Sequence, residues 1–107
     1  MSKDVNIYIH HILLSVDRIL EFTQGLTWED FSKTFLVQDA VIRNLEIIGE
    51  ASKKVAVAFK EAHPEIEWKK MAGMRDRLIH DYMGVDIEAV WAVVTQILPE
   101  LKKQLSD

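Results

Sequence analysis

Residues 75–82, RDRLIHDY, contain side chains that could bind an anion and transfer a proton. Arg75 offers a permanent cation for a phosphate, and His80 is the residue type that exchanges protons near neutral pH. Asp76 stands four residues before His80, so on a helix it would face the imidazole and tune its affinity for a proton. The types and spacing of these residues therefore predict acid-base chemistry at a bound phosphate.

The same stretch follows a helical pattern. At about 100° per residue, Arg75 lies at the centre of the apolar face, and Tyr82 lies about 20° from it. Asp76 and His80 fall on the rim of that face. The apolar residues that define it are Met71, Leu78, Ile79 and Met83. Because a buried guanidinium is costly unless it is paired, Arg75 needs either a carboxylate partner or a function.

A purely structural arrangement explains these residues as well as a functional one does. In it, Arg75 bonds Glu46 or Glu50 of the preceding helix, and Asp76 bonds His80. In the functional arrangement, Arg75 binds a phosphate and His80 transfers a proton, although the two diverge by about 140° around one helix. A homodimer would bring both residue types into one cleft more easily than a monomer would.

Four helical segments are expected to position this stretch. Apolar spacing predicts helices over about 4–23, 34–62, 68–83 and 87–101. Thr27, followed three residues later by Asp30, predicts a capping box that opens a short extra helical turn. Pro99 should weaken the last turns and leave residues 102–107 frayed. Short connections then favour an all-α fold, an antiparallel up-and-down four-helix bundle.

Length, charge and composition limit the possible functions. With 107 residues, 49% of them hydrophobic, residues 1–107 are expected to form a single helical domain. The net charge of -4 argues against a general nucleic-acid coat protein. That charge is uneven, because residues 43–80 hold eight lysines and arginines against six acidic residues, so a local anion site remains possible.

The sequence favours a cytoplasmic protein without a metal or cofactor. It has no cysteine, which excludes disulfides, a thiolate nucleophile and cysteine-ligated metals. It shows no membrane span and no signal peptide. His10 and His11 are adjacent, so on a helix they point about 100° apart and do not form an i, i+4 ligand pair. Glu46 and Glu50 share a helix face and are more simply ion-pair partners than a catalytic dyad.

Two motifs together resemble a known family. Arg75, His80 and Tyr82 match the R-x4-H-x-Y motif of the HEPN superfamily, in its HepT-like branch. The stretch VIRNLEIIGEASKKV, residues 41–55, resembles the same branch, and with the helical pattern the resemblance covers essentially the whole chain. At the position of Asp76 the family commonly has asparagine, although aspartate also occurs.

The resemblance implies a metal-independent endoribonuclease that is the toxin of a toxin-antitoxin pair. Arg75 and His80 would be its catalytic residues, with Asp76 in a supporting role. RNA would be the substrate, cut through its own 2′-hydroxyl. The partner would be a minimal nucleotidyltransferase antitoxin that transfers AMP to Tyr82. The toxin would form a homodimer, or a larger assembly with the antitoxin.

Two other functions are consistent with the sequence. The chain could be a non-catalytic helical subunit that binds a nucleotidyltransferase and presents its substrate or accepts AMP. It could also be a structural bundle in which Arg75 and His80 belong to a satisfied polar network. The low basicity favours these two alternatives, whereas the intact motif favours the ribonuclease.

Overall fold

A computed structural model describes residues 3–79 and 84–106. Most of these residues are helical. Within those ranges every named element is helical, which confirms the all-α class, and none of the helices could cross a membrane. The finer arrangement as an up-and-down four-helix bundle stays a prediction. The elements are α1 (Lys3–Thr23), α2 (Trp28–Lys33), α3 (Phe35–Lys54), α4 (Val57–Ala62), α5 (Trp68–Ala72), α6 (Met74–Leu78), α7 (Ile87–Ala92), the π-helical turn η1 (Val93–Ile97) and α8 (Leu98–Ser106).

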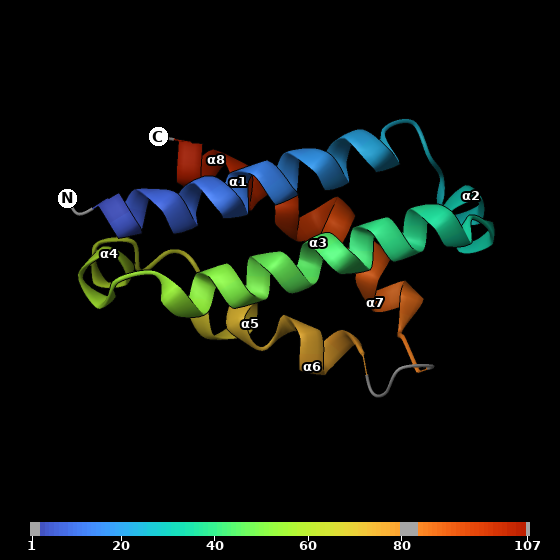
Figure 1. The fold of residues 1–107 in the computed structure, drawn as a ribbon. Helices are drawn as coiled ribbons and strands as arrows, with labels where there is room; N and C mark the ends of the chain where they lie inside the picture. Colours follow the sequence, from blue (N-terminus) through green and yellow to red (C-terminus); the bar gives the residue numbers. More distant parts are fainter. Residues whose placement is uncertain (1–2, 80–83, 107) are drawn as a thin grey trace.

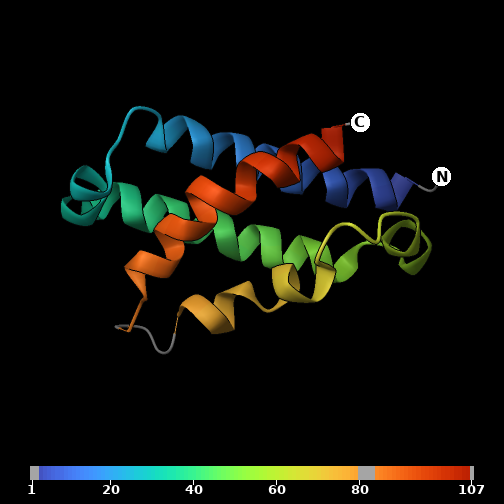
Figure 2. The same cartoon turned by 180° about the vertical axis from the view of Figure 1, so that it is seen from behind.

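Two long helices, α1 and α3, lie side by side along the molecule (Figure 1). Helices α5 and α6 follow one edge of α3. The segment formed by α7, η1 and α8 crosses α1 and α3 on the face that is turned away in Figure 1 and toward the viewer in Figure 2. The core fills the space between these layers and contains apolar side chains from each of them. Its least exposed members are Ile12, Val16, Ile19, Phe31, Val41, Ile48, Val90 and Leu98.

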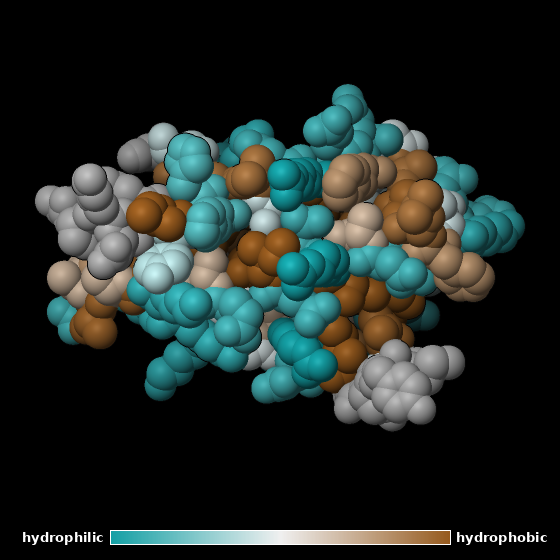
Figure 3. Space-filling model, in the orientation of Figure 1, coloured by the Kyte–Doolittle hydropathy of each residue, from teal (hydrophilic) through white to brown (hydrophobic). Residues whose placement is uncertain are grey.

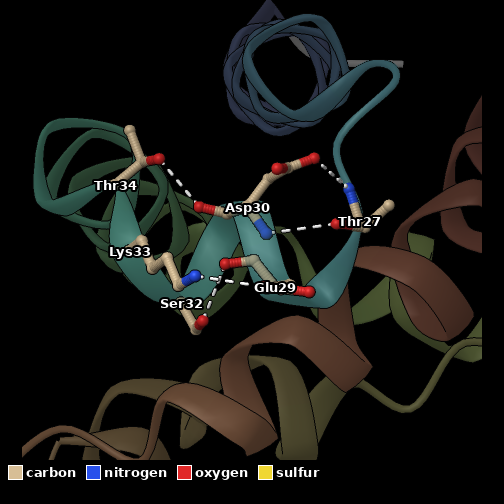
Figure 4. A network of polar contacts seen from close by, with 6 residues as sticks. All are labelled: Thr27, Glu29, Asp30, Ser32, Lys33 and Thr34. Carbon is tan, nitrogen blue, oxygen red and sulfur yellow. Dashed lines mark hydrogen bonds and ion pairs between the residues drawn. The ribbon is translucent and has the colours of Figure 1, made fainter.

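The predicted capping box begins α2 (Figure 4). The backbone N–H of Thr27 donates to the Asp30 carboxylate at 3.1 Å, and the Asp30 N–H donates back to the Thr27 hydroxyl at 3.1 Å. The hydrogen bond from the Thr27 backbone lowers the pKa of Asp30 below its ordinary value, because it stabilises the charged carboxylate. Two free N–H groups are satisfied in this way, so a six-residue helix forms between α1 and α3.

The helix predicted over residues 34–62 is broken in the structure. Helix α3 ends at Lys54, Val55 is extended with φ −66° and ψ 137°, and α4 begins at Val57. The β-branched side chains of Val55 and Val57 flank the break, and such side chains lose rotamer freedom inside a helix. Val55 is buried in the core in its extended conformation, so tertiary packing overrides the helical spacing.

The helix predicted over residues 68–83 is also shorter and broken. Helix α5 ends at Ala72, Gly73 separates it from α6, and α6 ends at Leu78. Ile79 is extended, with φ −120° and ψ 105°, and forms an isolated antiparallel bridge with Val85. The predicted helix is therefore interrupted at Ile79.

The last helix is longer than its sequence predicts. Asp86 caps α7 by accepting the Ala89 N–H at 3.0 Å. Fraying after Pro99 is wrong, since α8 continues to Ser106 and Lys102 pairs with Asp17 of α1 at 2.9 Å. The missing N–H of Pro99 would leave a helical carbonyl without a donor, and the π-helical turn just before it absorbs this irregularity.

Candidate functional site

Arg75 lies on α6 with its guanidinium in solvent rather than in the core. Its side chain is 52% exposed, and its Nε lies 3.4 Å from Glu46 Oε2 on α3. The predicted burial of Arg75 is therefore wrong. The buried face of α6 is formed by Met74 and Leu78, which are one turn apart, and Arg75 lies at the edge of that face.

Two carboxylates contact the Arg75 guanidinium, one from α3 and one from α6 itself. Glu46 is 34% exposed, and Asp76, which is 86% exposed, places Oδ1 at 3.6 Å from Nη1 of Arg75. The predicted pairing with a glutamate of the long helix is confirmed for Glu46, while Glu50 pairs with Lys53 at 3.2 Å. A guanidinium has more N–H donors than these two contacts use, so Arg75 keeps donors for an anion.

Beneath the pair, Arg75 and Glu46 share a small hollow of about 10 Å³ with apolar side chains. Its apolar members are Ile42, Leu45, Leu78, Ile79 and Val90. Such a floor excludes water from one side of the guanidinium and strengthens its interaction with a charge on the other. Arg75 is thus a half-exposed cation positioned beside Glu46 at the surface.

Gly49 allows α5 to approach α3 closely. A Cβ at this position would lie 3.3 Å from the Met71 carbonyl oxygen and 3.6 Å from that of Ala72. This contact sets α5, and α6 after it, against α3, one turn beyond Glu46. The packing role of Gly49 was not predicted, although a glycine inside a helix costs about 1 kcal/mol relative to alanine and therefore signals a packing role.

The structure brings together Arg75, Asp76 and Glu46 from α6 and α3. The predicted catalytic His80 and the predicted AMP acceptor Tyr82 lie outside the described residues. Their predicted placement relative to Arg75 therefore stays a prediction. Within the described ranges, no cluster of three or more histidine, aspartate and glutamate side chains could hold a metal ion.

Comparison with known proteins agrees with the sequence motif. A family model described as Ribonuclease HepT-like matches residues 12–107. A protein of Thermococcus cleftensis, named as a probable ribonuclease HepT, is 47% identical over 102 residues, which cover 95% of this chain and 93% of the relative. A Methanocaldococcus jannaschii protein, named as a gamma-glutamylcyclotransferase and candidate RNase, is 48% identical over 105 residues. That match covers 98% of this chain but only 47% of the relative, so the chain spans about half its length.

A solved structure shares the fold. It is that of a tri-AMPylated HEPN toxin of Shewanella oneidensis in complex with MNT antitoxin, and it matches with a TM-score of 0.71 and 21% sequence identity. The match covers 99% of this chain and 96% of the toxin. At 21% sequence identity, this structural similarity shows a shared fold and no more.

Replacing Gly49 with leucine is expected to separate α5 from α3. The new side chain would meet the backbone carbonyls of Met71 and Ala72, so we expect the free energy of unfolding to fall by about 1–3 kcal/mol in urea denaturation. Gly73→Ala is the matched control, because its Cβ would lie 3.4 Å from the Lys69 carbonyl oxygen, an ordinary contact. Equal stability of Gly49→Leu and Gly73→Ala would contradict the packing role of Gly49.

Proposed function

The chain belongs to the HepT-like ribonuclease family, and on this premise we propose that it cleaves RNA with Arg75 and His80. The observation that carries the proposal is the state of Arg75, a half-exposed cation held by Glu46 where a phosphate can reach it. Ile79, which precedes His80 in the chain, lines the same small hollow as Arg75. In this proposal, residues 1–107 form one helical ribonuclease domain that is arranged as a four-helix bundle.

The proposed reaction is transesterification within the RNA. The 2′-oxygen attacks phosphorus, the bond from phosphorus to the 5′-oxygen breaks, and the products are a 2′,3′-cyclic phosphate and a 5′-hydroxyl. His80 takes the proton from the 2′-hydroxyl and delivers it to the leaving 5′-oxygen, and Arg75 stabilises the charge that develops on the phosphorane oxygens. Asp76 and Glu46 orient the guanidinium. Because the cation is supplied by Arg75, this chemistry proceeds without a metal ion.

RNA cleavage in the presence of EDTA tests this proposal. We expect wild-type protein to cut single-stranded RNA to cyclic-phosphate ends, and Arg75→Ala and His80→Ala each to lower the rate at least about 100-fold. Arg75→Ala should change the free energy of unfolding by less than about 1 kcal/mol, because its ion pair is half exposed. Arg77→Ala, on the same helix, is the matched control and should cleave normally.

Two results would contradict the assignment. Unchanged cleavage in Arg75→Ala and His80→Ala would place the active site elsewhere. No cleavage by wild-type protein would favour the alternative function, a non-catalytic helical subunit that binds a nucleotidyltransferase.

A homodimer with a shared cleft is the second part of the proposal. Large apolar side chains are exposed at the start of α3, where Phe35 is 73% and Leu36 82% exposed, and Figure 3 shows hydrophobic atoms at that end of the molecule. Exposed apolar surface of this kind is typical of an interface. In a two-fold dimer, each cleft would combine residues of both subunits.

Mixing two inactive variants tests the shared cleft. Light scattering at micromolar concentration should give twice the 12.4 kDa mass of the chain. If each cleft takes Arg75 from one subunit and His80 from the other, mixed Arg75→Ala and His80→Ala protein should recover about a quarter of wild-type activity, since half the dimers hold one intact site. A monomer, or a dimer without recovery, would contradict this arrangement.

Neutralisation by AMP transfer is the third part of the proposal. The solved toxin of the same fold is AMPylated and bound to an antitoxin. In this chain, the Tyr82 hydroxyl oxygen would attack the α-phosphorus of ATP, losing its proton while pyrophosphate leaves. The AMP group would place a negative charge and a purine beside the catalytic residues, where they compete with RNA.

Tyr82→Phe is expected to keep ribonuclease activity and to escape neutralisation by the nucleotidyltransferase and ATP. The other tyrosine, Tyr8, provides the control, since Tyr8→Phe should still be silenced. Intact-protein and peptide mass spectrometry would locate the adenylate. Adenylate on a residue other than Tyr82, or silencing without any adenylate, would contradict the mechanism and favour steric blocking.

A further inference from the structure

A shallow hollow of about 720 Å³ lies beside α5, and we call it the lysine hollow because lysines predominate among its lining residues. Its lining comes from α3, α4, α5 and the residue before α5, and its charged and aromatic members are Lys53, Lys60, Glu67, Trp68, Lys69 and Lys70. Four lysines therefore surround one glutamate in a chain whose net charge is -4. All four lysines belong to the basic stretch between residues 43 and 80 that the sequence shows.

The lysine hollow keeps unneutralised positive charge. Lys70 pairs with Glu67 at 2.7 Å, and Lys53 pairs with Glu50 at 3.2 Å. Lys60 and Lys69 form no ion pair with any residue of the described ranges. An anion entering the hollow would therefore meet two lysines that are not paired with a carboxylate of the described residues.

The lysine hollow lies along the same edge of α3 as the Arg75 site. Lys53 follows Glu46 by seven residues on α3, a separation of about 10 Å along the helix axis. Helix α5 leads directly into α6, which carries Arg75, and both helices lie against α3 (Figure 1). A few nucleotides of single-stranded RNA can span this distance.

We propose that the lysine hollow binds the RNA backbone next to the bond that is cut, which rests on the proposed ribonuclease function. Lysines contact phosphates without reading bases, and the indole of Trp68 is buried and donates its N–H to the His63 carbonyl at 3.1 Å. The hollow therefore holds the strand independently of its sequence. An acidic protein overall needs such a local surface to retain RNA.

Binding measurements test the proposal with a matched pair of double variants. Lys60→Gln/Lys69→Gln removes the unpaired lysines, and Lys33→Gln/Lys103→Gln removes the same charge from α2 and α8. The probe is a fluorescein-labelled 2′-O-methyl oligouridine of about 20 nucleotides, followed by anisotropy over a range of KCl concentrations. We expect the hollow variant to lower the slope of log affinity against log salt by about 1.4, from two lost phosphate contacts, and the control to leave it unchanged.

Cleavage of long and short RNA separates this inference from the proposed function. The hollow variant should raise KM for a long RNA several-fold and leave kcat, and the cleavage of a dinucleotide, unchanged. If wild-type protein binds RNA with the lysine-dependent slope but does not cleave it, the ribonuclease proposal fails and the lysine hollow stands. If wild-type protein cleaves RNA but the hollow variant has the same salt-dependence slope and the same KM for long RNA as the control variant, the proposed role of the lysine hollow in RNA binding is overturned.

Two further outcomes would also overturn the proposal. Wild-type protein that does not bind the probe at all would exclude an RNA-binding hollow. A hollow variant that binds RNA normally but loses affinity for the nucleotidyltransferase would assign the hollow to a protein partner. Misfolding is not expected to obscure these results, because Lys69 is exposed, Lys60 is only half-buried, and surface substitutions of this kind change stability by about 0.5 kcal/mol or less.

Discussion

The close packing of α5 on α3 at Gly49 is the contact on which the candidate site depends. The absence of a side chain there lets the Met71 and Ala72 carbonyls rest against α3. Helix α6 follows directly, so its second residue, Arg75, reaches Glu46 one turn away on α3. A single glycine thus determines where the cation stands, and a carboxylate from the neighbouring helix determines how it is oriented.

Local signals made much of the fold predictable. Apolar spacing defines α1, the pair Thr27 and Asp30 defines the start of α2, and Asp86 defines the start of α7. The helix breaks at Val55 and Ile79 were missed because neither is encoded by proline or a cap. Val55 leaves its helix and is buried in the core, and Ile79 leaves its helix and pairs with Val85. The apolar spacing that predicts helices contains no information about either contact.

The chemistry of the site was predictable by residue type but not by geometry. Arg75 was identified from the motif and its pairing with a glutamate was anticipated, yet its exposure depends on α6 being short and burying Met74 instead. For the lysine hollow, too, the residue types could be predicted from the sequence but their arrangement in space could not. The charge imbalance is visible in the sequence, but Lys60 joins the lysines of α3 and α5 only because the chain leaves its helix at Val55.

Binding of an RNA phosphate by Arg75 can be followed by NMR through the side-chain Nε–Hε signals of the arginines. The chain has four arginines, Arg18, Arg43, Arg75 and Arg77, so the signals can be assigned by single substitution to lysine. On titration with a 2′-deoxy RNA analogue that cannot be cleaved, the Arg75 signal should shift most, because its guanidinium donors engage the phosphate. An Arg75 signal that stays in place while the analogue is bound, or a larger shift at another arginine, would contradict the account.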